Sequence, residues 1–289
     1  MTKNTYEIFI VGTTQDGGYP HIGCNLECCK DAWSNPELKR YASSIAIVDH
    51  QNKKYFLIDV SPDLSEQLHM FYSVYGNSYS FSGIFLTHAH VGHYMGLFKL
   101  GLEMMNSNKI PLYAMPEMMK FLKDNSSTNF LFESNNIADN IIKEKQLIEL
   151  DANLSISPFY VPHRNELSET VGYKIKSDDK SVIYIPDVDS WEECDFNILD
   201  MVSQNDYLFL DGTFYDKSEL YTRDISKIPH PSIIDSIKTF KSLSNDNKSK
   251  IFFTHLNHTN NLLRKDSDEY KTVIEKKYNI LHEKQKFLL

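Results

Sequence analysis

The stretch FLTHAHVGHYMGL, residues 85–97, places three histidines within six positions, directly after an apolar run. His88 and His90 are two positions apart on what we expect to be extended backbone, so their side chains point the same way, and His93 approaches from the first turn of a following helix. Imidazole nitrogens bind zinc and other borderline divalent metals. The stretch therefore predicts a compact three-histidine tripod for a metal at the end of a strand.

Elsewhere in the chain, polar residues again follow apolar, β-prone runs within a residue or two. These residues are Asp59, His88, His163, Asp187, Asp211 and His255. Side chains at strand ends lie on a rigid frame where loops meet, which is where an α/β protein usually assembles its site. We expect them to converge on one rim and to form a binuclear metal cluster. The predicted ligands are His88, His90, His93, His163, Asp187 and His255.

Ten apolar runs predict β-strands, and helical patterns fall between some of them. The predicted strands lie within residues 6–13, 43–50, 54–63, 81–90, 110–116, 154–163, 170–177, 180–187, 206–213 and 248–255. Helices are expected within 61–76, 92–107, 230–245 and 267–279. The chain has no internal repeat and no long linker, so we expect a single α/β domain over residues 1–289. Two β-sheets would pack face to face with helices outside.

Charge and composition exclude several classes of protein. The net charge of -9 and the pI near 5.7 argue against a nucleic-acid or membrane-surface binder. No apolar stretch is long enough to span a bilayer, and the first residues do not resemble a signal peptide. Three of the four cysteines cluster and Cys194 stands alone, a poor disulfide framework. We therefore expect a cytoplasmic protein that acts on a small molecule; a homodimer is compatible with the sequence.

The ligand pattern resembles that of the metallo-β-lactamase superfamily, whose signature H-x-H-x-D-H precedes separate His, Asp and His ligands at strand ends. The matching segments are THAHVGHYMGL (87–97), YVPHRNE (160–166), YIPDVDS (184–190) and FFTHLNH (252–258). The resemblance runs from about residue 7 to about residue 262. It implies an αββα sandwich of two mixed sheets with the metal site at one edge, Asp187 as the bridging carboxylate and Asp59 as the early structural aspartate.

Within that superfamily, GTTQDGGYPHIGC (12–24), DGTFY (211–215) and HLNHTN (255–260) resemble the pyrroloquinoline quinone biosynthesis protein B family. A second likeness is to the phosphoribosyl cyclic phosphate phosphodiesterases, and it implies a structural zinc. The implied ligands are Cys24, Cys28, Cys29 and His258, a set that suits a closed tetrahedral site. Adjacent Cys28 and Cys29 need an irregular turn to face one ion, and His21 is an alternative fourth ligand. Thiols without a metal are the other interpretation.

Gly92 departs from the family pattern, because the aspartate of the signature ligates the second metal and glycine has no side chain. His88, His90 and His163 still form an open set for the first metal. For the second metal, Asp187, His93 and His255 remain, with a further oxygen from water, from Asp189 or from the substrate. A single metal is the alternative.

These ligands favour a hydrolase, since a divalent metal lowers the pKa of its bound water and polarises a carbonyl or phosphoryl oxygen. The metal is expected to be zinc, with manganese or iron as alternatives. The predicted general base is Asp187, then Asp211, with Asp16 and the acidic end of PHRNELSE (162–169) as further candidates. Asp211 is equally well explained as a strand-end carboxylate that accepts backbone hydrogen bonds from Gly212 and Thr213.

The predicted substrate contacts are polar residues that could bind a phosphate or carboxylate: Arg164, Arg223, His230 and the segment 15–23. The favoured function is hydrolysis of a small phosphodiester or another ester-like metabolite. The resemblance to the quinone biosynthesis family implies an alternative, a non-haem iron oxygenase with iron on His93, His255 and Asp187. A third hypothesis is a metal-stabilised binding protein that has lost catalysis through Gly92.

Overall fold

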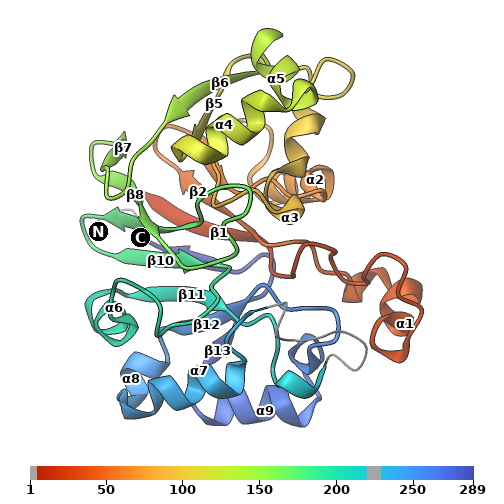
Figure 1. The fold of residues 1–289 in the computed structure, drawn as a ribbon, viewed down its shortest axis with the longest axis vertical. Helices are drawn as coiled ribbons and strands as arrows, with labels where there is room; N and C mark the ends of the chain where they lie inside the picture. The colour runs from red at the N-terminus through yellow and green to blue at the C-terminus, as the bar shows by residue number, and fades with distance from the viewer. Residues whose placement is uncertain (1–4, 220–228) are drawn as a thin grey trace.

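The computed structural model describes residues 5–219 and 229–289, so the predicted substrate contact Arg223 lies outside the described residues. Two seven-stranded sheets pack face to face, and helices cover the outer face of each, as Figure 1 shows. This is the αββα sandwich expected from the sequence. None of the helices in the described ranges is long and apolar enough to cross a membrane.

The first sheet has the order β14-β1-β2-β3-β4-β5-β6. Its pairings are antiparallel from β14 to β3 and parallel from β3 to β6. The strands are β1 (Tyr6–Gly12), β2 (Ser44–Asp49), β3 (Lys54–Ile58), β4 (Ser80–Phe85), β5 (Ile110–Ala114), β6 (Ile137–Ile141) and β14 (Lys286–Leu288).

The second sheet has the order β13-β12-β11-β10-β9-β8-β7. Its pairings are parallel from β13 to β10 and antiparallel from β10 to β7, so both sheets are mixed, as predicted. The strands are β7 (Ile148–Asp151), β8 (Leu154–Tyr160), β9 (Val171–Ser177), β10 (Ser181–Ile185), β11 (Tyr207–Asp211), β12 (Ile251–Thr254) and β13 (Asn279–Ile280).

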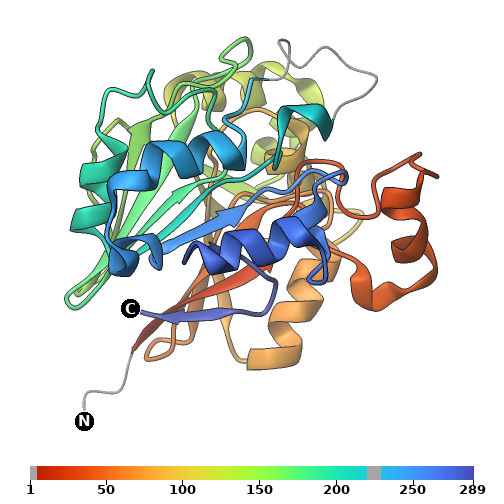
Figure 2. The same ribbon diagram turned by 90° about the horizontal axis from the view of Figure 1, so that it is seen from below.

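The helices divide between the two outer faces, apart from α1 (Glu27–Ser34), which lies to one side of the sandwich in Figures 1 and 2. The first sheet is covered by α2 (Leu64–Tyr75), α3 (Val91–Tyr94), α4 (Pro116–Asp124) and α5 (Ser126–Glu133). The second sheet is covered by α6 (Ile198–Gln204), α7 (Ile233–Thr239), α8 (Asn245–Lys248) and α9 (Asp268–Glu275).

The continuous apolar runs in the sequence follow from burial of both faces of each sheet. In β1, Ile8 and Ile10 belong to the core between the sheets, whereas Phe9 and Val11 pack under the helices of the first sheet. In β10 and β11 the same alternation places Tyr184 and Phe209 in the core between the sheets. Ile183, Leu208 and Leu210 pack under the helices of the second sheet. A strand that is apolar on both sides requires a layer on each side, and four layers result.

All ten predicted strands form, but one predicted helix was wrong. Residues 92–107 were expected to be helical; the structure has the single turn α3, a 3-10 segment at Met95–Leu100 and then turns. Glycine disfavours helix, and Gly92, Gly96 and Gly101 recur in this segment. The chain also passes very close to the loop after β3, since a Cβ on Gly96 would lie 2.3 Å from the Ser61 carbonyl oxygen. Strands β6, β7, β13 and β14 were not predicted, and neither were α1, α4, α5, α6 and α8.

Candidate metal centre

The predicted ligands meet where parallel strands of the two sheets end. His88 follows β4, Asp187 follows β10 and His255 follows β12, and β10, β11 and β12 run parallel, so their carboxyl ends share an edge. His163 follows β8, and His93 belongs to α3. The structure therefore brings the six predicted ligands, His88, His90, His93, His163, Asp187 and His255, to one rim.

Three imidazoles form the first group of this centre. His88, His90 and His163 each offer a ring nitrogen, and these atoms all lie within 4.8 Å of one another. The Nε2 atom of His163 is 3.2 Å from Nδ1 of His90, and the rings of His88 and His90 have centroids 4.5 Å apart. His90 is extended, as expected, and precedes the first turn of α3. Such a set matches the three-ligand arrangement of catalytic zinc sites.

Asp187 lies at the middle of the centre and is almost completely buried. Its Oδ2 atom is 3.0 Å from Nε2 of His93, 3.3 Å from Nε2 of His255 and 3.8 Å from Nε2 of His88. Its Oδ1 atom is 3.6 Å from Nε2 of His163. One carboxylate thus faces imidazoles of both groups, which is the position of a bridging ligand.

Two threonines orient two of the imidazoles. The Thr87 hydroxyl donates to the Asp59 carboxylate, at 3.0 and 2.9 Å from its oxygens, and so accepts from Nδ1 of His88 at 2.9 Å. Because Nδ1 of His88 carries the hydrogen, the lone pair of its Nε2 faces the centre.

The same relay recurs on the second sheet. The Thr213 hydroxyl donates to Asp211 at 2.7 Å and accepts from Nδ1 of His255 at 2.9 Å. Nε2 of His255 therefore also keeps its lone pair for a ligand bond. The sequence did not indicate Thr87, and it indicated Thr213 only as a backbone donor to Asp211, although each stands next to or near a predicted site residue in THAH and DGTFY.

Carboxylates hold two further imidazoles directly. Nδ1 of His93 donates to Oδ2 of Asp59 at 2.7 Å, and Nδ1 of His163 donates to Oδ1 of Asp189 at 2.7 Å. Such carboxylate–imidazole pairs fix the ring of a metal ligand and raise its basicity. Asp59, fully buried, thus serves both His93 and the Thr87 relay.

The centre contains buried polar atoms without hydrogen-bond partners in the described part of the chain. They are Nε2 of His88, His90 and His255, Oδ2 of Asp187 and Oδ1 of Asp16. A buried polar atom without a partner is costly, and several at one rim call for partners from outside the chain. The carboxylate oxygens and Nε2 of His88 and His255 offer lone pairs, which a cation satisfies and a hydrogen-bond acceptor does not. The donor set therefore fits a divalent metal.

Electrostatics favour the metal-binding forms of these side chains. Burial, with repulsion from neighbouring imidazoles, lowers the pKa of His88 and His255, and it lowers the pKa of His90 to about 4. These rings are neutral at physiological pH, as metal ligation requires. Burial raises the pKa of Asp187, but the surrounding histidines outweigh it and hold the carboxyl ionised. His93 is the exception: burial opposes a charge on this ring, but Asp59 and Asp187 raise its pKa, so a bound metal would have to displace a proton from it.

The geometry argues against Asp211 as a general base. Oδ1 accepts from the backbone and hydroxyl of Thr213, and Oδ2 accepts from the Val188 amide at 3.0 Å and from Nδ1 of His230 at 2.6 Å. All acceptor positions of this buried carboxylate are occupied. The interpretation of Asp211 as an acceptor of backbone hydrogen bonds was correct for the Thr213 amide. It was wrong for Gly212, whose amide donates to the Thr254 carbonyl. Asp211 positions His230 and the Thr213 relay.

His230 lies beside the centre and is almost fully buried. Its ring centroid is 5.4 Å from that of His163 and 6.1 Å from that of His255. Burial lowers its pKa, but the Asp211 carboxylate at 2.6 Å outweighs burial and raises the pKa to about 9. A protonated imidazole next to the ligands suits the predicted contact with an anionic substrate group.

Two other predicted residues are engaged elsewhere. The Asp189 carboxylate accepts hydrogen bonds from His163 and from the Arg164 amide, the latter at 3.2 Å, so it orients the first group. It is not among the residues gathered around His93 and His255. The Arg164 guanidinium binds Glu166, with Nη2 at 2.5 Å from the carboxylate. Its charge is thereby partly neutralised at an exposed position.

Asp16 occupies the place that the sequence left open at Gly92. Its Oδ1 atom is 3.5 Å from Nε2 of His93. Asp16, His93 and His255 offer ligand atoms that all lie within 4.8 Å of one another.

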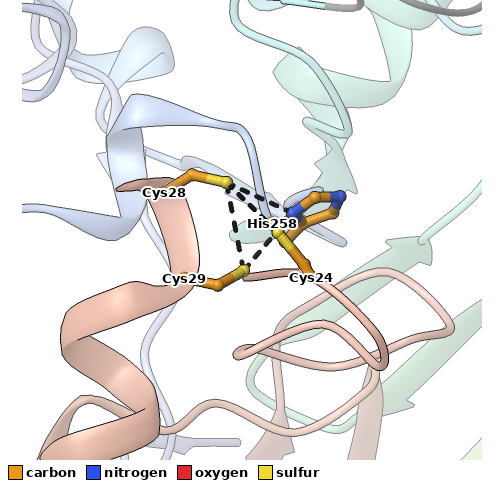
Figure 3. A group of neighbouring side chains, drawn as sticks. All are labelled: Cys24, Cys28, Cys29 and His258. Carbon is orange, nitrogen blue, oxygen red and sulfur yellow. Dashed lines mark hydrogen bonds between the residues drawn. The ribbon is translucent and has the colours of Figure 1, made fainter. Parts of the chain in front are cut away.

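A second cluster joins Cys24, in the loop before α1, and Cys28 and Cys29, in the first turn of α1, to His258 after β12 (Figure 3). The Sγ atoms of Cys24 and Cys28 are 3.6 Å apart, those of Cys28 and Cys29 are 4.0 Å apart, and Nδ1 of His258 is 3.6 and 3.4 Å from Cys28 and Cys29. Tetrahedral zinc with sulfur bonds of about 2.3 Å separates its ligands by roughly 3.8 Å. The cluster therefore has the dimensions of the predicted structural site. His21 instead packs against His258, with ring centroids 4.4 Å apart and the ring planes tilted by 33°.

A pocket of about 460 Å³ opens beside His163. Its lining is rich in carboxylates, of which only the acidic end of PHRNELSE (162–169) was indicated by the sequence: Glu117, Glu166, Glu169, Glu193 and Asp195. No lysine or arginine of the described ranges is among the lining residues. Glu169 is partly committed, since it accepts from the first amides of α4.

Comparison with known proteins places these features in context. The family described as "Beta-lactamase superfamily domain" matches residues 54–256. Coenzyme PQQ synthesis protein B of Methylorubrum populi is 24% identical over 305 aligned residues, covering 96% of this chain and 97% of that protein. The crystal structure of Zn²⁺-bound PqqB from Methylobacterium extorquens has a TM-score of 0.78 at 22% identity, covering 98% and 100% of the two chains. A diphosphatase of the PhnP family has a TM-score of 0.70 at 23% identity, covering 98% and 96%.

Proposed function

The chain belongs to the β-lactamase superfamily, and we propose that it is a metal-dependent hydrolase that cleaves an ester-like bond in a small phosphodiester or a related metabolite. The observation that carries this proposal is the convergence of imidazole nitrogens and the Asp187 carboxylate at one rim, with unpartnered lone pairs facing one another. The shared fold with a PhnP-family diphosphatase supports phosphate ester chemistry. A small-molecule substrate also suits the net charge of -9, which disfavours nucleic acid.

Two cations would be held by different parts of the centre. His88, His90 and His163 would bind the first, and His93 and His255 the second, with Asp187 between them. The ligand types suit zinc, and the PqqB structure with the same fold contains Zn²⁺. When bound, such a cation supplies a water of lowered pKa and polarises the substrate oxygen.

His230 is the group we assign to the substrate. Its Nδ1 hydrogen is committed to Asp211, so Nε2 is the atom left to face a substrate. The carboxylate behind the ring stabilises the protonated form, which donates to an oxygen that gains negative charge as the ester bond breaks. His230 would therefore bind the anionic group and supply a proton to the leaving oxygen.

The acidic pocket restricts the remainder of the substrate. Its carboxylates, among them Glu193 and Asp195, repel a second anionic group placed near His163. The part of the substrate that enters this pocket is therefore neutral or cationic.

Hydrolysis is tested with purified protein and bis(p-nitrophenyl) phosphate, before and after metal removal by a chelator and after re-addition of Zn²⁺ or Mn²⁺. We expect turnover that chelation abolishes and metal restores, and that His163→Ala lacks. Turnover that survives complete removal of the metal contradicts the proposal. Bound metal without activity on any phosphate or carboxylate ester would favour the binding-protein hypothesis.

A second candidate is an oxygen-using iron enzyme. His93 and His255 lie 3.0 and 3.3 Å from Oδ2 of Asp187, a two-histidine, one-carboxylate set of the type that binds Fe²⁺. The chain is also 24% identical over nearly its whole length to a coenzyme PQQ synthesis protein, a member of the family whose resemblance implied this alternative. Protein purified without air and loaded with Fe²⁺ would then consume oxygen when mixed with substrate candidates, and the zinc form would not hydrolyse esters.

A further inference from the structure

We propose that Asp16 supplies the carboxylate ligand of the second cation that Gly92 cannot supply, so that this ligand comes from the loop after β1 and not from α3. The inference rests on the metal centre of the proposed function and deepens it. It concerns how many cations the centre holds and by which residues.

The first observation is that Asp16 fills the volume of a side chain at position 92. A Cβ atom built on Gly92 would lie 2.0 Å from Oδ1 of Asp16 and 2.6 Å from its Cα. Real atoms never approach so closely, so a side chain at 92 and the observed position of Asp16 exclude one another. Glycine at position 92 is therefore the condition for Asp16 to reach the centre.

The second observation is the direction of the carboxylate. Oδ1 of Asp16 is buried, lies 3.5 Å from Nε2 of His93 and makes no hydrogen bond within the described residues. Asp16, His93 and His255 form a group whose ligand atoms lie within 4.8 Å. Nε2 of His255 and Oδ2 of Asp187 are equally unpartnered in the described part of the chain, and both side chains are more than nine-tenths buried. Two carboxylate oxygens and one imidazole nitrogen without hydrogen-bond partners, gathered around His93, make up a set of lone pairs that a cation would satisfy.

The third observation is how the Asp16 loop is held. The Gln15 amide donates to the Leu256 carbonyl at 3.0 Å, and the Leu256 amide donates to the Thr13 carbonyl at 3.0 Å. Leu256 directly follows the predicted ligand His255. These hydrogen bonds join the backbone just before Asp16 to the residue just after His255, so the two side chains are positioned together before a metal binds.

Together these contacts change the interpretation of Gly92. A lost aspartate would leave the second cation with two histidines and Asp187 only, whereas Asp16 returns a carboxylate to the same volume. The second site is therefore complete, with Asp16, His93, Asp187 and His255 as its protein ligands.

The test measures bound metal and not activity. Wild type, Asp16→Asn, Asp16→Ala and Gly92→Ala are dialysed against Zn²⁺, and metal per chain is counted by mass spectrometry, with stepwise affinities from calorimetry. Asp246→Asn, which removes an exposed carboxylate of α8, is the charge-matched control. Circular dichroism and occupancy of the cysteine site report whether each variant is folded.

We expect each Asp16 variant to lose one ion per chain, or to bind its weakest ion in the centre at least about tenfold more weakly, a scale typical of damage to a metal site. Gly92→Ala should show the same loss because its methyl group displaces Asp16, although alanine favours helix. Asp246→Asn should match wild type. If the Asp16→Asn substitution prevents folding, the Asp16→Ala protein gives the same reading.

Wild-type metal content and affinities in Asp16→Asn or Asp16→Ala would overturn the inference and leave the hydrolase proposal standing. A wild-type centre that binds a single ion would overturn it as well, because no second site would exist. A centre that binds no ion would instead remove the proposed function, so the two failures are distinguishable.

Discussion

Oδ2 of Asp59 accepts a hydrogen bond from Nδ1 of His93 at 2.7 Å, and both side chains are buried. Asp59 has a φ of 63°, a left-handed conformation that Asp and Asn tolerate better than most residues. Asp59→Asn should therefore fold but lose the charge that orients His93. We expect metal affinity of the centre to fall about 10- to 100-fold, measured by competition with a chromophoric chelator. Unchanged affinity would show that Asp59 only supports the fold.

Thr213→Val keeps the shape of the side chain and removes the hydroxyl between Asp211 and His255. Nδ1 of His255 then loses its acceptor, so its tautomer is no longer fixed. We expect weaker binding of the ion that His255 holds, by about tenfold, with Thr213→Ser close to wild type. Calorimetric titration with Zn²⁺ distinguishes the two variants; equal affinities for both would argue against the relay.

Two buried tyrosines on paired strands give a matched test of stability. The Tyr173 hydroxyl donates to the Leu86 carbonyl of the opposite sheet at 2.7 Å, whereas the hydroxyl of its register partner Tyr184 has no hydrogen-bond partner among the described residues. Tyr173→Phe should lower the free energy of unfolding by about 1–2 kcal/mol, because a buried carbonyl loses its donor. Tyr184→Phe should be neutral or stabilising. Urea unfolding of both variants checks this, and equal losses would contradict it.

His282 should make the fold sensitive to acid. Burial, with the charges of Lys265 and Arg40, lowers its pKa to about 4, below the 6.5 of an unfolded chain. Between these values the unfolded state binds more protons, so this contribution to stability is lost as pH falls from 6.5 to 4. Wild type should lose stability between pH 7 and pH 4.5 that His282→Gln does not lose. Allowing for partial exposure of the ring, we expect this difference in the free energy of unfolding to be about 1–2 kcal/mol. Urea unfolding at both pH values tests this; parallel profiles would refute it.

Metal removal should expose the cysteine cluster. The segment around α1 has a small core of its own, so a metal bound by Cys24, Cys28, Cys29 and His258 would tie it to the sandwich. A strong chelator should make three thiols reactive towards a disulfide reagent and lower the melting temperature. Cys194, whose pKa burial raises to about 12, should remain unreactive in the native protein and serves as the internal control. Full thiol reactivity before chelation would contradict a bound metal.

The spacing of polar residues behind apolar runs was sufficient to predict the sandwich and six side chains that meet at the rim, but it indicated Asp16 only as a candidate base. The sequences of β1 and β10 are apolar at successive positions, which predicts burial on both faces of the strand. A histidine or aspartate that directly follows such a strand lies at the edge of the sheet, so its place in the sequence predicts its place at the rim. The prediction of a helix over residues 92–107 was wrong because glycines in this segment allow two backbones to pass close together, as at Gly96. The spacing of apolar residues carries no information about such an approach.

The sequence by itself determined the layers, the rim and the chemical type of the ligands, because these depend on local alternation and on strand order. Only the tertiary structure decided how Gly92 is compensated, why Asp211 is a positioning group and which threonines fix the imidazole tautomers. Those relationships join residues far apart in the chain, such as Asp16 with Gly92 and Asp211 with His230. They depend on separations of 2–4 Å between residues of different loops, which spacing along the chain does not specify.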